Sequence, residues 1–217
     1  MADDDSRAGH SYATAEILDW VARVHAMHDA ALARAFDAPR RHGMPAIQLG
    51  PSEAKGLALL LKLAGARRVV EIGTLAGYSA LAMARALPED GTVFTVEYDP
   101  KHARVARENV AAAGESARIT VLEGAGLDVL PTLEPRAPFD AVFVDADKKS
   151  YDLYGRWAAK NLRKGGLLVG DNAYLFGRLL EDSAEAAAMR RFHEESTEVF
   201  DTVCLPTPDG LFVGIRR

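Results

Sequence analysis

The amino-acid sequence predicts a single α/β domain, built on a mostly parallel sheet with helices on both faces. From residue 68 onward, short apolar runs alternate with longer segments of helical periodicity, and glycine or proline separates many of them. Repeated strand–helix units of this kind form parallel sheets that helices cover on both sides. The chain closes with two apolar runs joined by residues 206–210, Pro-Thr-Pro-Asp-Gly, which predict a hairpin and an antiparallel strand at the sheet edge.

The strands and helices follow one another in a regular order. Strands are expected over residues 68–72, 92–97, 118–122, 139–144, 167–170, 198–205 and 211–215, which makes a seven-stranded sheet. Helices are expected between them, over residues 77–87, 100–113, 126–133, 150–162 and about 179–196.

The N-terminal part has a different pattern. Residues 1–10 are polar and acidic, and we expect them to be disordered. Residues 11–36 carry apolar side chains on a roughly helical period, which predicts one long helix or two short ones. Residues 37–51 contain three prolines and predict a loop, after which Ser52 is expected to cap a helix that runs to about Leu63. The expected division is a tail, a helical cap and a core, residues 1–10, 11–64 and 65–217, with 11–217 as one domain.

Composition excludes several classes of protein. Hydrophobic residues make up 48% of the 217 residues and charged residues 26%, as in soluble globular proteins. No apolar run reaches the roughly 18 residues that cross a bilayer, and residues 1–9 do not resemble a secretory signal, so we expect a cytoplasmic protein without a membrane partner. The net charge of -5 does not favour nucleic-acid binding, and the single cysteine, Cys204, excludes an intrachain disulfide.

A ligand site is predicted at the loop over residues 73–77, Gly-Thr-Leu-Ala-Gly, because ligands of such sheets bind at the carboxyl ends of strands. The loop matches neither the dinucleotide pattern G-x-G-x-x-G nor a Walker A motif. Glu71 precedes it and Glu97 ends the next strand. Two acids flanking a glycine loop suit a ligand with a ribose and a positive charge, such as S-adenosylmethionine. The alternative is that both glutamates are solvated residues at strand ends.

A metal site is predicted from the next strand ends. Asp145 follows the fourth strand, and Asp171 and Asn172 follow the fifth, so all three reach one edge of the sheet. Oxygen ligands without histidine or cysteine suit a hard cation, Mg²⁺ or another divalent ion such as Mn²⁺ or Ca²⁺. The alternative is ordinary turn chemistry, since Asp and Asn are common where strands end.

Lys148 is the candidate general base. It lies three residues after Asp145, and a nearby divalent cation disfavours the charged ammonium, which lowers the pKa of a lysine. A lysine in this position without a metal would be a solvated surface residue.

These motifs together resemble the metal-dependent class I O-methyltransferases of the caffeoyl-CoA and catechol type. The resemblance runs from about Gly43 to the C-terminus and implies a Rossmann-like class I methyltransferase fold. Its motifs are Glu71-Ile72-Gly73-Thr74, Gly77-Tyr78-Ser79, Glu97, Gly124-Ala125-Gly126, Val144-Asp145-Ala146-Asp147-Lys148, Asp171-Asn172 and Asp209-Gly210-Leu211.

The resemblance also implies roles for individual residues. The methionine part of S-adenosylmethionine would lie among Glu71, Gly73, Thr74, Gly77, Ser79 and Asp145. Glu97 would bind the ribose, with Tyr98 and Gly126 near the adenine. Asp145, Asp171 and Asn172 would hold the metal, Lys148 would be the base, and Tyr154 would lie near the substrate. A homodimer is a further expectation from the resemblance.

The acceptor side departs from the family pattern. After Asp171-Asn172 the family often has Leu-Trp, where this chain has Tyr174-Leu175-Phe176. We expect Leu175, with Tyr154 and Lys148, to contact the acceptor. The predicted activity is S-adenosylmethionine-dependent O-methylation of a small aromatic acceptor with vicinal hydroxyls. Two alternatives stay open on the residues alone: a nucleotide-binding oxidoreductase of similar fold, and a non-catalytic module that binds S-adenosylmethionine.

Overall fold

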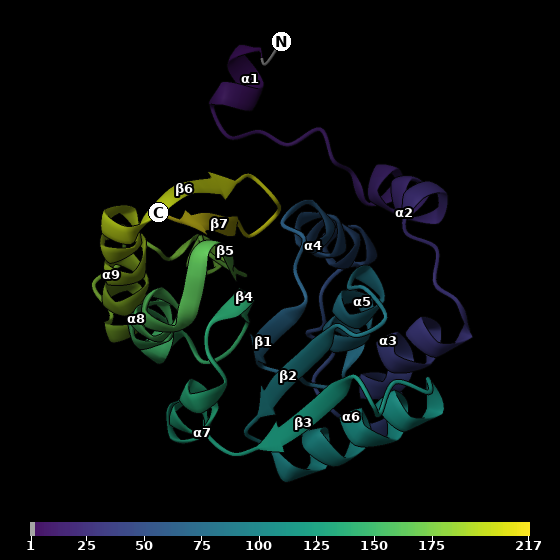
Figure 1. Ribbon diagram of the computed structural model, residues 1–217. Coiled ribbons are helices and arrows are strands. Elements are labelled where there is room, and N and C mark those ends of the chain that lie inside the picture. Colours follow the sequence, from purple (N-terminus) through teal and green to yellow (C-terminus); the bar gives the residue numbers. More distant parts are fainter. Residues whose placement is uncertain (1–2) are drawn as a thin grey trace.

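One sheet organises the protein, as the computed structural model shows for the described residues, 3–217 (Figure 1). Its strand order is β3-β2-β1-β4-β5-β7-β6, with parallel pairing from β3 through β5, while β7 runs antiparallel to β5 and β6. The strands are β1 (Arg68–Ile72), β2 (Thr92–Glu97), β3 (Ile119–Glu123), β4 (Phe139–Val144), β5 (Leu162–Gly170), β6 (Phe200–Leu205) and β7 (Leu211–Arg216). The predicted seven-stranded α/β sheet with a C-terminal hairpin is confirmed.

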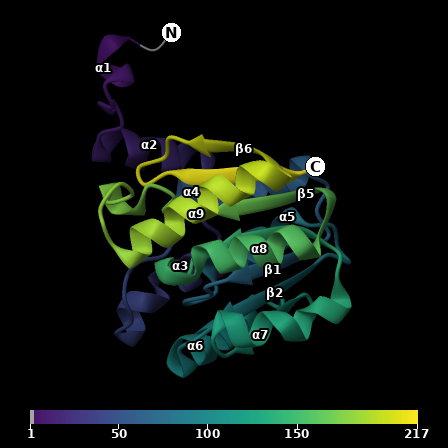
Figure 2. The same ribbon diagram turned by 90° about the vertical axis from the view of Figure 1, so that its left-hand side faces the viewer.

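Helices cover both faces of the sheet (Figures 1 and 2). One face carries α4 (Pro51–Leu63), α5 (Tyr78–Ala86) and α6 (Pro100–Ala112), and the other carries α7 (Gly126–Leu133), α8 (Tyr151–Asn161) and α9 (Ala184–Val199). Side chains alternate between two cores, so Val69 joins the core with α4 and α5, while Val70 joins the core with α8 and α9. Burial on both faces explains why the central strands read as continuous apolar runs.

The N-terminal segment differs from the prediction at its start and agrees with one of the two predicted alternatives after it. The structure places a one-turn helix, α1 (Asp4–Arg7), within the segment expected to be disordered, whose first two residues lie outside the described residues. Residues 11–36 form the helix α2 (Ala15–His25) and most of the helix α3 (Ala30–His42), which is the two-helix alternative of the prediction. Helices α1 and α2 extend away from the sheet (Figure 1).

The predicted loop over residues 37–51 is wrong for its first part, because α3 continues to His42. Pro39 lies inside this helix and is buried together with Ala38. The packing of these side chains compensates for the backbone hydrogen bond that the proline nitrogen cannot donate. Gly43 ends the helix with a left-handed φ of 58°, and Met44 N donates to Pro39 O at 2.9 Å, as in a Schellman motif.

Several other boundaries differ from the prediction because other residues cap the helices. Gly50, not Ser52, precedes α4, and its N–H donates to the Glu53 carboxylate at 2.9 Å. Helix α9 starts at Ala184, where Ser183 caps it, and not at about residue 179. Strand β5 starts earlier than predicted, through a register shift against β4. Short 3₁₀ turns are η1 (Glu134–Arg136), η2 (Lys148–Ser150) and η3 (Leu175–Gly177). Among the described helices, none has the length and hydropathy needed to cross a membrane.

Candidate functional site

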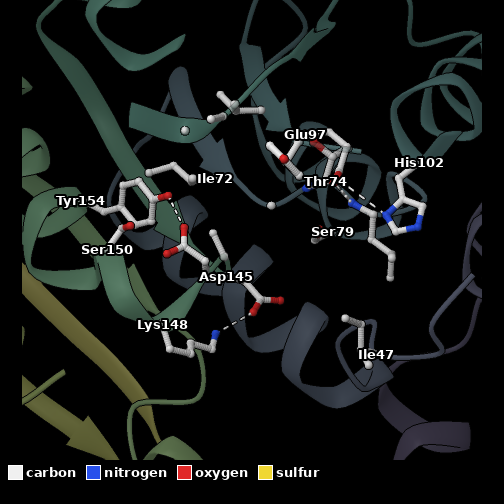
Figure 3. A pocket seen from close by; sticks show the side chains of 18 of the residues that line it. Ile47, Ile72, Thr74, Ser79, Glu97, His102, Asp145, Lys148, Ser150 and Tyr154 are labelled. Carbon is white, nitrogen blue, oxygen red and sulfur yellow. Dashed lines mark hydrogen bonds and ion pairs between the residues drawn. The ribbon is translucent and has the colours of Figure 1, made fainter. Parts of the chain in front are cut away.

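A cavity of about 960 Å³ opens at the carboxyl ends of β1, β2 and β4, next to the point where the strand order reverses. Its walls come from five segments, each the end of an element or the loop that follows it (Figure 3). They are residues 47–49, 72–79 without Gly77, 96–98, 124–128 and 145–150 without Lys149, with His102, Tyr154, Asn172 and Phe176 completing the lining. Most of the predicted site residues therefore meet in one place.

The glycine loop needs its two glycines for different reasons. Gly73 has φ 99°, and a Cβ there would collide with the backbone carbonyl oxygen of Asp145, so only glycine allows β1 and β4 to approach so closely. Gly77 has φ 82°, begins α5 and lies against Ala106. Gly77, which was predicted to bind the cofactor, does not line the cavity, and its observed contribution is to the backbone turn that begins α5.

Glu97 holds the glycine loop in shape. Its Oε2 accepts hydrogen bonds from Thr74 N at 3.1 Å and Leu75 N at 2.8 Å, and its Oε1 accepts from Asp99 N at 2.9 Å. Leu75 has φ 50°, a strained value that these bonds help to maintain. His102 Nδ1 lies 3.6 Å from Oε1 and also lines the cavity. A carboxylate has about four acceptor positions, so Glu97 has little capacity left for two ribose hydroxyls.

Glu71 is fully buried beneath the loop. Its Oε2 accepts from the Thr95 hydroxyl at 2.5 Å, and that hydroxyl lies 2.5 Å from the hydroxyl of Thr74. Burial raises the pKa of Glu71 to about 8, although the nearby hydroxyl groups of Ser79 and Thr95 oppose the shift. Among the described residues, Glu71 Oε1 has no hydrogen-bond partner. A positively charged donor beside the loop would satisfy this oxygen and stabilise the ionised carboxylate.

The predicted metal residues converge at the ends of β4 and β5. Asp145 and Asn172 line the cavity, while Asp171 lies behind them and is 8% exposed. Burial first, and the neighbouring Asp145 second, raise the pKa of Asp171. Within the described residues, no group of three or more His, Cys, Asp or Glu side chains is placed to hold a metal ion. The candidate ligands are thus two carboxylates and one amide.

Lys148 reaches the same corner of the cavity (Figure 3). Its Nζ lies 3.3 Å from Asp145 Oδ1, 3.2 Å from the Tyr151 hydroxyl and 4.7 Å from the centre of the Tyr151 ring. The Tyr151 hydroxyl is buried between the carbonyl oxygens of Val144, at 2.8 Å, and Asp171, at 2.6 Å. Sequence reasoning missed Tyr151, although a tyrosine three residues after the lysine was a usable signal.

Tyr154, which was predicted to lie near the substrate, lines the cavity beside the loop over residues 124–128. Its hydroxyl donates to Asp147 Oδ2 at 2.5 Å, and its ring lies beside Ile72 and Ser150 (Figure 3). A Cβ added to Gly126 would come within 2.8 Å of the Tyr154 hydroxyl. Tyr154 thus neighbours the predicted adenine segment, because its helix packs over that end of the cavity.

The acceptor-side prediction chose the wrong neighbour at residue 175. Leu175 is fully buried in the core with α8 and α9 and does not line the cavity. Phe176 lines the cavity instead and is 60% exposed. Both residues have left-handed backbone, φ 52° and 54°, which costs on the order of 1–3 kcal/mol each. Tyr98, which was predicted to lie near the adenine, lines the cavity.

Comparisons with known proteins agree on one family. The family model described as O-methyltransferase matches residues 24–217. A catechol O-methyltransferase of Niastella koreensis is 44% identical over 170 residues, covering 76% of this chain and 77% of that protein. An O-methyltransferase from Bacillus cereus in complex with SAH superposes with a TM-score of 0.89 and 32% identity, over 93% of this chain and 97% of that one. The O-methyltransferase TomG from Streptomyces achromogenes, in complex with SAM, has a TM-score of 0.86 and 34% identity over 93% and 96%.

Proposed function

Since this chain belongs to the O-methyltransferase family and is an S-adenosylmethionine-dependent O-methyltransferase, we propose that it methylates one hydroxyl of a vicinal dihydroxy aromatic acceptor with the help of a divalent metal ion. Membership in the family sets aside the oxidoreductase and the non-catalytic module. The single observation that carries the finer proposal is the convergence of Asp145, Asp171, Asn172 and Lys148 at one corner of the cavity.

The chemistry of this corner fits a hard cation. Asp171 is a buried carboxylate next to Asp145, and the only cation within hydrogen-bond distance of that pair in the described residues is Lys148. Asp171 is buried and Asp145 is partly buried, with one lysine beside Asp145, and the pKa of Asp171 is raised first by its burial and second by the charge of Asp145. Asp145, Asp171 and the amide oxygen of Asn172 would hold Mg²⁺, Mn²⁺ or Ca²⁺ and leave about three positions for other oxygens. A bound divalent ion would orient the two acceptor hydroxyls and lower their pKa.

The cofactor would occupy the rest of the cavity. Glu71 and Asp145 provide negative charge for the ammonium and sulfonium of S-adenosylmethionine. His102 provides a polar atom at the ribose, and Glu97 has about one acceptor position left for a ribose hydroxyl. Tyr98 and Gly126 border the adenine space. The roles of Gly73, Thr74 and Ser79 near the methionine are supported by their position in the cavity wall.

The reaction needs one proton acceptor and correct alignment. Lys148 Nζ, held by Asp145 and Tyr151, is placed to accept the proton of the acceptor hydroxyl. The oxygen attacks the methyl carbon, the carbon–sulfur bond breaks, and S-adenosylhomocysteine leaves with the electron pair on sulfur. Phe176 and Ile47 provide an apolar wall for an aromatic ring. Most of the rate enhancement would come from this positioning and from electrostatics.

An assay of S-adenosylhomocysteine release tests both parts of the proposal. Purified protein is incubated with S-adenosylmethionine and a panel of catechols, each paired with the matching monophenol. We expect turnover of catechols only, loss of turnover in EDTA, and recovery when Mg²⁺, Mn²⁺ or Ca²⁺ is restored. Equal turnover of the monophenols would refute the vicinal-diol acceptor, and activity that survives thorough chelation would refute the metal.

We also propose that the protein forms a homodimer. Helix α2 carries exposed apolar side chains, including Trp20 at 58% and Val24 at 52% exposure, and α4 exposes Leu63 at 85%. A second copy would bury these surfaces, which a monomer leaves in water. Sedimentation velocity at micromolar concentration should show a dimer in the wild type and a shift to monomer in Trp20→Asp; a wild-type monomer would contradict the proposal. The cytoplasmic location and the absence of nucleic-acid and membrane partners stay predictions.

A further inference from the structure

The acceptor loop, which we define as residues 172–177, has an unusual backbone. Three of its non-glycine residues have left-handed φ values, 53° at Asn172, 52° at Leu175 and 54° at Phe176. Side chains disfavour this conformation, so it persists only where surrounding contacts hold it. Asn172 and Phe176 are also the two residues of the loop that line the cavity. Whatever holds this backbone therefore determines what the cavity presents to an acceptor.

The turn between β6 and β7 makes the holding contacts. Ala173 N donates to Gly210 O at 2.9 Å, and Tyr174 N donates to Asp209 O at 2.9 Å. The Asp209 side chain adds a third bond, because its Oδ1 accepts from Phe176 N at 2.7 Å. The ring of Tyr174 lies against Gly210, so closely that a Cβ there would come within 2.7 Å of it. A hairpin distant in sequence thus shapes the acceptor loop.

Apart from the bond to Phe176 N, the side chain of Asp209 lacks hydrogen-bond partners on its second carboxylate oxygen among the described residues. This oxygen, Oδ2, is buried. A buried carboxylate oxygen without a partner is unfavourable, so stability of the turn does not by itself account for aspartate at this position. The bond to Phe176 N is what the side chain contributes to the loop.

We propose that Asp209 is a positioning residue for the acceptor, and this inference rests on the proposed function of the same cavity. By binding Phe176 N, the carboxylate keeps the Phe176 ring at the cavity and Leu175 in the core. The same hairpin keeps Asn172 in place through the adjacent residue, Ala173. The glycine loop and Glu97 lie on other strands, so cofactor binding does not depend on this contact.

Two substitutions at Asp209 and one control test this role. Asp209→Ala removes the acceptor for Phe176 N, whereas Asp209→Asn keeps an oxygen that can accept the bond. Asp201→Ala removes an exposed carboxylate on β6 and serves as the matched control. We expect Asp209→Ala to raise the KM for the acceptor about tenfold and to leave the Kd for S-adenosylmethionine within about twofold. Asp209→Asn and the control should stay near wild type.

Hydrogen exchange of the amides at residues 174–177 provides a readout that does not depend on activity. We expect faster exchange there in Asp209→Ala, with unchanged exchange at residues 71–79. Unchanged loop exchange and KM in Asp209→Ala would overturn the inference, as would a large KM increase in Asp209→Asn with normal loop exchange. If wild-type protein methylates no catechol, the proposed function fails, yet the exchange data still decide whether Asp209 holds the loop. If Asp209→Ala does not fold, Asp209→Asn decides the question by the same two readouts.

Discussion

Replacing Glu71 by Gln tests the electrostatics at the centre of the site. Glu71 is fully buried, and burial raises its pKa from an ordinary value of 4.5 to about 8. Its carboxyl group is therefore protonated at neutral pH in the folded protein without cofactor and ionised in the unfolded chain. Gln has a similar shape and stays neutral at every pH, so the variant isolates the effect of this one proton.

The expected magnitude follows from proton linkage. Between pH 4.5 and about 8 the folded state binds this proton and the unfolded state does not. The contribution of this proton to the free energy of unfolding is therefore fully present below pH 4.5. It decreases as the pH rises, by roughly 1.4 kcal/mol per pH unit in the middle of this window. The loss ends above about pH 8, where both states are ionised. Other groups, including Asp171, occur in both proteins, so their effects cancel in the difference.

Urea unfolding followed by far-ultraviolet circular dichroism measures this difference. Unfolding free energies of wild type and Glu71→Gln, both without cofactor, are compared at pH 5.5, 6.5 and 7.5. We expect the free energy of unfolding of Glu71→Gln, minus that of the wild type, to increase by about 2–3 kcal/mol from pH 5.5 to pH 7.5. Glu123→Gln, on the exposed edge strand β3, provides a control for the loss of one carboxylate. A difference between wild type and Glu71→Gln that does not change with pH would refute the reasoning.

Two further substitutions examine the base and the loop. Lys148→Ala should lower kcat by about 10²–10⁴-fold because the proton acceptor is lost, while calorimetry finds the Kd for S-adenosylmethionine nearly unchanged because the glycine loop and Glu97 are intact; a variant with near-normal kcat would exclude Lys148 as the base. Gly73→Ala should abolish S-adenosylmethionine binding in the same calorimetric assay, because its Cβ would collide with the backbone carbonyl oxygen of Asp145 and separate β1 from β4. Retained affinity would show that the two strand ends can move apart at little cost.

The order of elements was readable from sequence because its signals are local. Strands β2 and β4 and helix α7 lie at the predicted residues, since an apolar run, a helical period and a turn residue are all properties of neighbouring residues. The same is true of the acids at strand ends. Parallel strands bring their carboxyl ends to one edge, so the sequence alone predicts that Asp145, Asp171 and Asn172 meet there.

Only the tertiary structure decided which way individual side chains face. Leu175 is buried and Phe176 faces the cavity because the Asp209 carboxylate holds a left-handed backbone at these residues. Asp209 lies on a hairpin more than 30 residues away, and no local sequence pattern predicts the left-handed backbone. Helix α3 continues past Pro39 because packing outweighs a local penalty. Sequence alone therefore determined the fold class, the position of the cavity and the carboxylate and amide groups at the ends of β4 and β5, whereas the cavity wall at Phe176 depends on contacts between distant segments.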